Sequence, residues 1–405
     1  MTRVRRPALA VAAVLLLAGC GATAKADDPT WVPAPTFQGE GGLPPDVPGG
    51  NNGAPTDPNS SRGPSPSGPT PKPSSSVDPF VVATKLTSPV GLTVLPDDTA
   101  LVGERTTGRI VRVQPVAGKP VKTVRTLTGL NTSGDGGLLD LALSPNYAQD
   151  SLIFAYVTTA TDNRVITFTL TGPATPVLTG IPRGTTGNTG RIVFGSDGLL
   201  YVGTGDAGQP KLAADPKSLA GKVLRVTDIG QPGPGNPAPT SPVFTSGHRV
   251  VDGLCLIPDP NRLVEVEAHG SAGPDEVNVL TGGKSYGWPA SSQPSEAPTA
   301  TIPSAQRGPG GCAVLGDQLY VTSLDGKALL AAGLSSKAGV FVTTTFTAAL
   351  TNKYGRLRTV VADPANGVLW LTTSNRDGHG KPVTTDERVL RIPPPGGGGS
   401  DNSPA

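Results

Sequence analysis

A sixfold repeat constrains this chain more than any other feature of its sequence. Each copy has an alternating apolar run, a turn rich in Pro, Asp or Gly, and a second run rich in β-branched residues. Period-two alternation between turns indicates β-strands, and no segment shows sustained helical periodicity. The copies begin at Gly91, Leu141, Ile192, Leu254, Cys312 and Val360.

Six copies at intervals of about 50 to 60 residues predict a six-bladed β-propeller rather than a β-sandwich. We therefore expect an all-β fold over residues 79–392. The short run Phe80–Ala83 should pair into the last blade, which closes the ring and leaves no open sheet edge.

The N-terminus has the pattern of an export signal. Three arginines precede an apolar stretch at residues 8–18, which is too short to span a bilayer. The stretch runs into the sequence LAGC, ending at Cys20, which resembles the lipobox of bacterial lipoproteins. Residues 1–19 are then a lipoprotein signal peptide, and Cys20 carries fatty acyl chains such as palmitate that anchor the protein to the membrane. The alternative is an ordinary secretory signal with an incidental cysteine.

Composition sets two further segments apart. The chain has 54 Gly and 44 Pro among 405 residues, and the linker in residues 20–78 consists largely of Pro, Gly, Ser, Asn and Thr. Such a segment buries too little apolar surface to offset its ordering entropy, so we expect a disordered tether. Residues 393–405 form a similar tail. The net charge of +2, with no basic run after residue 6, argues against a nucleic-acid partner.

Two cysteines remain in the repeats. Cys255 and Cys312 occupy the same relative position in two successive copies. Outside the cytoplasm, we expect a disulfide between neighbouring inner strands. The alternative is a pair of buried free thiols that behave as small apolar residues.

An ordered series of motifs makes the interpretation more specific. From Gly190 to Pro289 the chain contains, in order, GRIVFGSDGLLYVGTGDAG, LAGKVLRV, SGHR, HGSAGPDEVN and GGKSYGWP. This series resembles the soluble glucose dehydrogenase and aldose sugar (sorbosone) dehydrogenase family. The resemblance implies a six-bladed propeller that uses pyrroloquinoline quinone (PQQ) and calcium to oxidise a sugar. The lipobox, the tether and the paired cysteines further resemble propeller lipoproteins of mycobacteria and related actinobacteria.

The resemblance also assigns roles to single positions. The family's catalytic base falls on Gly187, so the usual histidine is absent, and His269 is the remaining candidate. The other interpretation of His269 is a turn histidine that hydrogen-bonds a neighbouring blade. Backbone carbonyls of Gly270 and Ser271 stand at the calcium turn. The positions implied to contact the cofactor are Arg249, Arg356, Arg358 and Asp135.

Acidic residues compete with these roles. Asp252 stands where the family has a neutral amide, and Asp325 where it has a lysine. The three arginines either form a cationic funnel for an anionic ligand or pair with carboxylates. The carboxylates in question are those of Asp135, Asp252 and Asp325. A second acidic set either binds structural calcium or caps backbone amides in turns. This set is Asp206, Asp275 and Glu276.

Two hypotheses for function follow, both for a lipoprotein on the extracytoplasmic face of the bacterial membrane. The first is a PQQ-dependent sugar or aldehyde oxidoreductase with an altered site. The alternative is a non-catalytic propeller that binds an envelope glycan, a small ligand or a partner protein at the channel mouth. A purely structural envelope spacer is a third interpretation.

Overall fold

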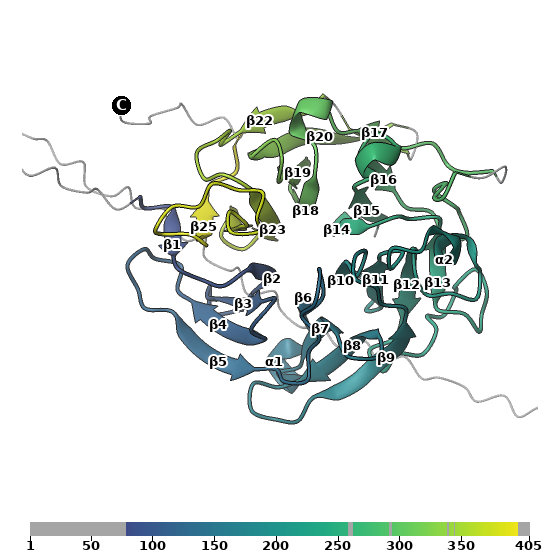
Figure 1. Ribbon diagram of the computed structural model, residues 1–405, viewed down its shortest axis with the longest axis horizontal. Helices are drawn as coiled ribbons and strands as arrows, with labels where there is room; N and C mark the ends of the chain where they lie inside the picture. Colours follow the sequence, from purple (N-terminus) through teal and green to yellow (C-terminus); the bar gives the residue numbers. More distant parts are fainter. Residues whose placement is uncertain (1–77, 258–261, 291–293, 338–339, 344, 396–405) are drawn as a thin grey trace, which may run out of the picture. The chain divides into compact units, whose positions relative to one another are not determined.

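Each of the six predicted repeat units forms one antiparallel sheet in the computed structural model, and the sheets are arranged in a ring (Figure 1). The structure describes residues 78–257, 262–290, 294–337, 340–343 and 345–395. The predicted signal peptide, Cys20, the linker up to residue 77 and the tail from residue 396 lie outside these residues. Within the described part of the chain, no helix is long and apolar enough to cross a bilayer.

The six blades follow the chain in order, and each begins with the strand nearest the axis. Blade 1 consists of β2 (Pro89–Val94), β3 (Ala100–Glu104), β4 (Arg109–Val113) and β5 (Lys122–Thr126). Blade 2 consists of β6 (Leu138–Leu143), β7 (Ile153–Thr158), β8 (Asn163–Phe168) and β9 (Thr175–Ile181). Blade 3 consists of β10 (Gly190–Phe194), β11 (Leu200–Thr204), β12 (Lys222–Val226) and β13 (Val243–Ser246).

The second half of the chain forms the remaining blades. Blade 4 consists of β14 (Val251–Ile257), β15 (Arg262–Glu267), β16 (Glu276–Val279) and β17 (Ala300–Thr301). Blade 5 consists of β18 (Pro309–Leu315), β19 (Gln318–Ser323), β20 (Ala328–Lys337), β21 (Val340–Thr343) and β22 (Thr347–Ala349). Blade 6 consists of β23 (Leu357–Asp363), β24 (Val368–Thr373), β25 (Val389–Ile392) and β1 (Val81–Ala83).

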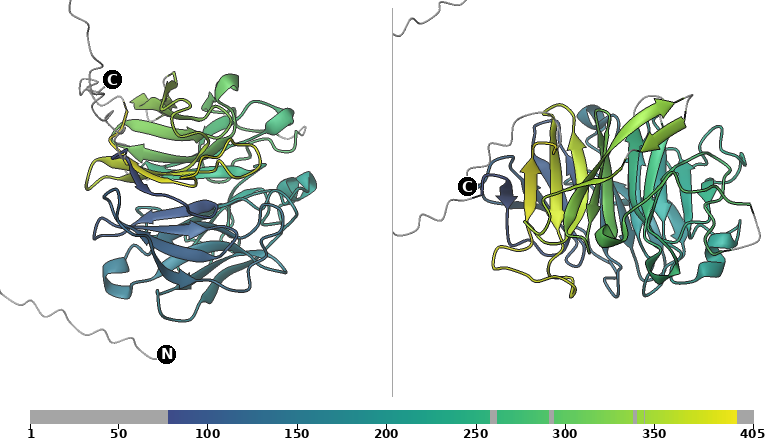
Figure 2. Two further views of the ribbon diagram at one scale, coloured as in Figure 1. Left: turned by 60° about the vertical axis from the view of Figure 1, so that its left-hand side comes forward. Right: turned by 90° about the horizontal axis from the view of Figure 1, so that it is seen from above.

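The predicted ring closure is confirmed. Strand β1 pairs antiparallel with β25, placing Val81 opposite Leu390 and Ala83 opposite Val389. The first strand of the chain thus completes the last blade, and inner strand β23 also contacts β2 of blade 1. Figure 2 shows the strands running between the two faces of the ring.

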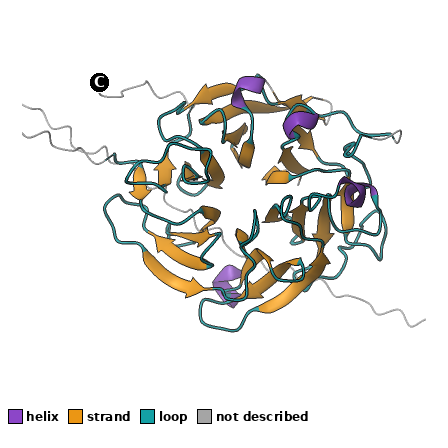
Figure 3. Cartoon of the chain, viewed as in Figure 1, coloured by secondary structure: helices purple, strands orange, loops and turns teal. Residues whose placement is uncertain are grey.

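Helices contribute only short turns between strands (Figure 3). They are α1 (Tyr147–Asp150), α2 (Pro210–Ala214) and the 3₁₀ turns η1 (Gly270–Ala272) and η2 (Ser304–Gln306). The loops that connect successive blades are thereby left to carry polar side chains.

The apolar core lies between blades. Each adjacent pair of blades shares a buried cluster, including the pair that closes the ring. Strand β11 shows why, because alternate side chains leave a strand on opposite faces. Leu200 and Val202 pack toward blade 2, whereas Tyr201 packs toward blade 4. A strand buried on both faces joins two interfaces.

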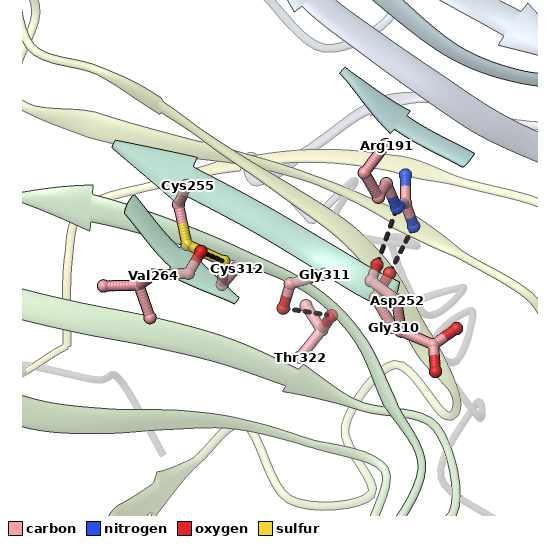
Figure 4. The surroundings of a disulfide bond; sticks show 8 residues. All are labelled: Arg191, Asp252, Cys255, Val264, Gly310, Gly311, Cys312 and Thr322. Carbon is pink, nitrogen blue, oxygen red and sulfur yellow. Dashed lines mark hydrogen bonds between the residues drawn. A yellow bond between two sulfur atoms is a disulfide. The ribbon is translucent and has the colours of Figure 1, made fainter. Parts of the chain in front are cut away.

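The predicted disulfide is confirmed. Cys255 on β14 is bonded to Cys312 on β18, with Cα atoms 5.8 Å apart (Figure 4). The bond joins the inner strands of blades 4 and 5 and closes a loop with a sequence separation of 57 residues. A crosslink over such a distance along the chain restricts the unfolded state most in the chain-entropy model.

Arg191 on β10 connects inner strands around the axis. Its Nε donates to the carbonyl of Asp252 on β14 at 2.6 Å, and a terminal nitrogen donates to the carbonyl of Gly310 on β18 (Figure 4). Its Nη1 lies 3.5 Å from Thr359 Oγ1 on β23 and 3.7 Å from the Asp140 carboxylate on β6. One buried guanidinium therefore contacts inner strands of four other blades.

The remaining inner strand is reached through Thr359. Its hydroxyl donates to the carbonyl of Val90 on β2 at 2.6 Å. Arg191 and Thr359 together contact all six blades around the axis.

We predict that Arg191→Met destabilises the propeller by about 3–5 kcal/mol, because the substitution leaves the buried Asp140 carboxylate without its cation and two carbonyls without their donor. The midpoint of urea denaturation, followed by circular dichroism, measures the loss. Arg112→Met is the matched control, since Arg112 forms a 3.4 Å surface pair with Asp97 and should cost less than about 1 kcal/mol. Equal losses in the two variants would contradict the role of Arg191.

Candidate functional site

The predicted site residues gather at one face of the ring, where the inner strands begin. The loop before β6 carries Asp135, the loop before β10 carries Gly187, and the loop before β14 carries Arg249. Arg356 precedes β23, and Asp325 follows β19, which runs antiparallel to its inner strand. Because all six inner strands start at this face, loops far apart in sequence meet around the channel mouth.

Asp135 links the loops of blades 2 and 3. Its carboxylate accepts the backbone N–H of Gly187 at 2.7 Å and the side-chain amide of Asn188 at 2.5 Å. Arg105 lies beside it and donates to the carbonyls of Gly134 and Gly136, both at 3.0 Å. The carboxylate thus orders the loop that carries the expected base position.

That base position has no room for a side chain. Gly187 has a φ of +71°, and a Cβ built there would lie 2.7 Å from Asp206 Oδ1 and 2.7 Å from the Gly208 nitrogen. Such distances are shorter than real Cβ contacts, and positive φ strains residues other than glycine. Asp206 is itself fixed, because its Oδ2 accepts the indole N–H of Trp288 at 2.9 Å.

The arginines at the mouth differ in their partners. Arg356 forms ion pairs with Asp325 at 2.7 Å and Asp377 at 2.8 Å. Arg249 donates to the carbonyl of Ala268 at 2.8 Å, and its guanidinium lies 5.6 Å from the ring centre of Trp288. Arg356 therefore follows the second of the two interpretations, in which the arginines pair with carboxylates.

Arg358 faces a cavity instead. The cavity has a volume of about 220 Å³, and the Nε of Arg358 has no hydrogen-bond partner among the described residues. Burial lowers the pKa of Arg358 to about 10, with a further contribution from Arg191. The residues lining the cavity are Val90, Asp135, Leu139, Thr189, Gly190, Arg191, Val250, Asp252 and Arg358.

His269 forms a pair with a buried carboxylate. Its Nε2 lies 2.7 Å from Glu267 Oε1 and 3.7 Å from Glu276 Oε2, and its backbone N–H donates to Asp275. Burial alone lowers the pKa of His269, but the hydrogen bond and charge of Glu267 outweigh it, so the pKa is raised. The partners lie in its own blade 4 rather than in a neighbouring blade.

The expected calcium turn forms η1. The carbonyl of Gly270 accepts a hydrogen bond from the guanidinium of Arg307, so a cationic side chain already contacts this oxygen. Ser271 lies in the same turn and is exposed.

The second acidic set follows the alternative interpretation, in which carboxylates cap N–H groups. Asp206 accepts the backbone N–H of Gly208 at 2.8 Å, and Asp275 accepts that of Gly308 at 2.8 Å. Glu276 instead faces His269.

Sequence reasoning missed two groups. The GRIVF motif predicts a strand but does not reveal the axial contacts of Arg191. The available signal is a charged residue in an otherwise apolar inner strand. The stretch LVEVE at residues 263–267 reads as a strand, and its buried glutamates are the second group. The available signal is its alternation, which places two glutamates on one face.

Comparison with known proteins identifies the family of this propeller. The model of the glucose/sorbosone dehydrogenase family matches residues 86–382, and the chain belongs to this family. A structural relative is the PQQ-bound aldose sugar dehydrogenase from Streptomyces coelicolor, with a TM-score of 0.71 and 38% identity over 77% of this chain and 96% of that one. The apo-form soluble aldose sugar dehydrogenase of Escherichia coli gives a TM-score of 0.66 at 25% identity, over 78% of this chain and 99% of that one.

Curated relatives match over shorter spans. The aldose sugar dehydrogenase of Escherichia coli K12 is 31% identical over 230 residues, which is 52% of this chain and 61% of the relative. Quinoprotein glucose dehydrogenase B of Acinetobacter calcoaceticus is 31% identical over 257 residues, which is 53% of each chain. The chain therefore spans little more than half the length of these curated relatives.

We predict that the propeller loses stability as the pH rises from about 5 to about 8. Burial raises the pKa of Asp252 to about 7, although Arg358 and Arg191 oppose the shift. A carboxyl with a raised pKa in the folded state stabilises the fold when protonated. Its contribution is complete below the unfolded pKa of about 4 and is lost as the pH passes through about 7.

Urea denaturation at several pH values tests this prediction. Asp252→Asn should flatten the slope of stability against pH, whereas the exposed control Asp317→Asn should leave it unchanged. Burial raises the pKa of Asp140 to about 6, so part of the slope should remain in Asp252→Asn. An unaltered slope in Asp252→Asn would count against the assignment.

Proposed function

We propose that this protein is an extracytoplasmic lipoprotein that uses the family scaffold to bind a neutral sugar unit of an envelope glycan at the channel mouth, without oxidising it. The observation that carries the proposal is the closed position at Gly187. The contacts of Asp206, Gly208 and Asp135 fill the space from which the family's base would act. General-base catalysis contributes about 10²- to 10⁴-fold to a reaction rate.

The charges around the mouth do not fit PQQ with its calcium. PQQ presents three carboxylates, but Arg356 is already paired with two aspartates. Asp135 and Asp252 line the cavity as further carboxyl groups. A cationic side chain, Arg307, contacts the carbonyl that would face calcium. The two arginines of the lining, Arg191 and Arg358, are thus matched by two carboxyl groups, which leaves no surplus of positive charge for a trianionic ligand. Its metal would also meet a cation.

A neutral polyol suits the same lining better. Its hydroxyl groups can donate to Asp135 and accept from Arg358 without adding net charge. Apolar walls at Val90, Leu139 and Val250 can pack against the C–H face of a sugar ring. At about 220 Å³ the cavity is smaller than the 300–1,000 Å³ typical of sites for drug-sized ligands. One sugar ring is the matching size class.

Retained sugar oxidation is the second candidate. It is favoured by the 38% identity to a PQQ-bound aldose sugar dehydrogenase and by the His269–Glu267 pair. If His269 donates its Nε2 proton to Glu267, its Nδ1 is the acceptor that would take a hydroxyl proton.

Calorimetric titration of detergent-solubilised full-length protein with neutral monosaccharides and soluble envelope-glycan fragments tests the proposal. We expect saturable binding of at least one of these sugars. Arg358→Met should weaken it about tenfold or more, because a hydrogen bond to a charged group is worth about 1.5–3 kcal/mol. The surface variant Arg112→Met should bind like the wild type.

Dye-linked oxidation of an aldose panel, with PQQ and Ca²⁺ added, separates the two candidates. We expect no turnover. Turnover that is lost in His269→Asn would overturn the proposal in favour of the second candidate. Absence of binding to every sugar and glycan tested would also reject it and would leave a partner protein or a spacer role.

We further propose that Cys20 is the membrane anchor, on the basis of the LAGC motif that follows the apolar stretch. Cells grown with a clickable palmitate analogue should label the wild-type protein. Cys20→Ser should abolish the label, because no other cysteine stands at a lipobox. Cys312→Ser is the matched control and should keep the label. Label retained in Cys20→Ser would exclude this anchor.

A further inference from the structure

A polar cluster lies buried at the junction of blades 3 and 4, beneath the mouth. Strand β15 contributes Glu265 and Glu267, which share one face because they are two residues apart. His248 comes from the loop between β13 and β14. All three side chains have 0% exposure.

Two atoms that face this cluster have no hydrogen-bond partner in the part of the chain that the structure describes. They are His248 Nδ1 and Glu265 Oε1, which lie 3.9 Å apart. His248 Nδ1 also lies 3.7 Å from Glu267 Oε2, too far for a hydrogen bond. Leaving fully buried polar atoms unpaired costs free energy, and burying carboxylates without compensation costs more.

The surrounding contacts hold each of these groups in place. His248 Nε2 bonds Thr245 Oγ1 at 2.8 Å, and the imidazole stacks on Tyr286 with ring centres 5.1 Å apart. The other oxygen of Glu265 accepts from Asn278 at 3.0 Å. Partners of this kind are typical around metal ligands, because they orient the rings and carboxylates that bind the ion.

Glu267 is held from two sides. Its Oε2 accepts the backbone N–H of Arg249 at 3.0 Å, and its Oε1 contacts His269 Nε2 at 2.7 Å. The carboxylate is therefore fixed against both the mouth loop and the cluster.

The spacing of three atoms in this cluster suits a small cation. The donor atoms of His248, Glu265 and Glu267 all lie within 4.8 Å of one another. Ligands about 2.1 Å from a tetrahedral ion are about 3.4 Å apart, close to the 3.7 and 3.9 Å observed. Small inward movements would complete such a geometry.

We propose that His248 Nδ1, Glu265 Oε1 and Glu267 Oε2 bind a divalent transition-metal ion of the Zn²⁺ type. An imidazole nitrogen with two carboxylates is a donor set that suits such ions. Calcium prefers six to eight oxygen ligands, which three residues with one nitrogen donor do not provide. The ion would neutralise the buried glutamates and tie the loop after blade 3 to blade 4.

This site is distinct from the expected calcium turn. That turn uses backbone carbonyls at Gly270 and Ser271, whereas the cluster uses side chains of β15 and of the loop that carries His248. The proposal is independent of what the mouth binds.

Metal content and thermal unfolding of the purified full-length protein, produced with Zn²⁺ in the medium, test the proposal. We expect about one Zn²⁺ per chain after dialysis, and at least tenfold less in Glu265→Gln. A chelator should lower the unfolding temperature of the wild type, and Zn²⁺ should restore it. Glu296→Gln, which alters an exposed pair with Lys284, should behave like the wild type.

The order of stabilities separates metal binding from a structural role. With Zn²⁺ the wild type should unfold at a higher temperature than Glu265→Gln. After chelation the order should reverse, because the variant removes a buried carboxylate that then lacks compensation. A wild type that holds no Zn²⁺ would overturn the proposal, as would a variant that binds Zn²⁺ equally. Either result would assign the cluster to a protonated Glu265.

If Glu265→Gln fails to fold, Co²⁺ loading of the wild type gives a second measurement. A ligand-field absorption spectrum of a low-coordinate site, removed by stoichiometric Zn²⁺, would support the proposal. A spectrum identical to that of aqueous Co²⁺ would reject it.

Discussion

The guanidinium of Arg191 is the contact on which the axial arrangement depends. Neighbouring blades also share apolar clusters, each formed by two sheets. Arg191, by contrast, contacts inner strands of four other blades, and Thr359 connects this set to the remaining one, blade 1. It also lines both the cavity at the mouth and an apolar channel of about 450 Å³ lined by the inner strands. A buried planar donor with several N–H groups suits this place, because four inner strands each present an oxygen toward it.

The distributed core explains how the mouth can change without loss of the fold. Strands near the axis bury their two faces against the blades on either side, so the loops at the mouth carry little of the apolar packing. Within this frame the mouth has become a set of internal contacts. Asp135 orders the loop at Gly187, Asp206 holds Trp288, and Arg356 is neutralised by two aspartates. Arg358 also faces the cavity, and its Nε has no hydrogen-bond partner among the described residues.

Blades 3 and 4 combine two kinds of interface. Apolar residues such as Val251 and Tyr286 fill part of the junction, whereas β15 brings two glutamates into it. Two buried carboxylates are unfavourable unless a cation accompanies them. Across blades 4 and 5 the corresponding connection is covalent, through Cys255 and Cys312. Blade 4 is thus joined to its neighbours by polar contacts on one side and by a disulfide on the other, as well as by apolar packing.

Sequence patterns alone predicted the number of blades, the closing strand and the disulfide. These features depend on local alternation and on equivalent positions in successive repeats, both of which a single chain displays directly. The family followed from an ordered set of motifs, and the resemblance placed the family's base position on Gly187. Which side chains come into contact across the ring could be seen only in the tertiary structure. The partners of Arg191 lie 61, 119 and 168 residues away along the chain. The space around Gly187 is filled by Asp206 from another loop, and Glu265 faces His248 across a blade junction. No local pattern encodes such meetings, because they depend on how the ring brings distant loops and strand faces together.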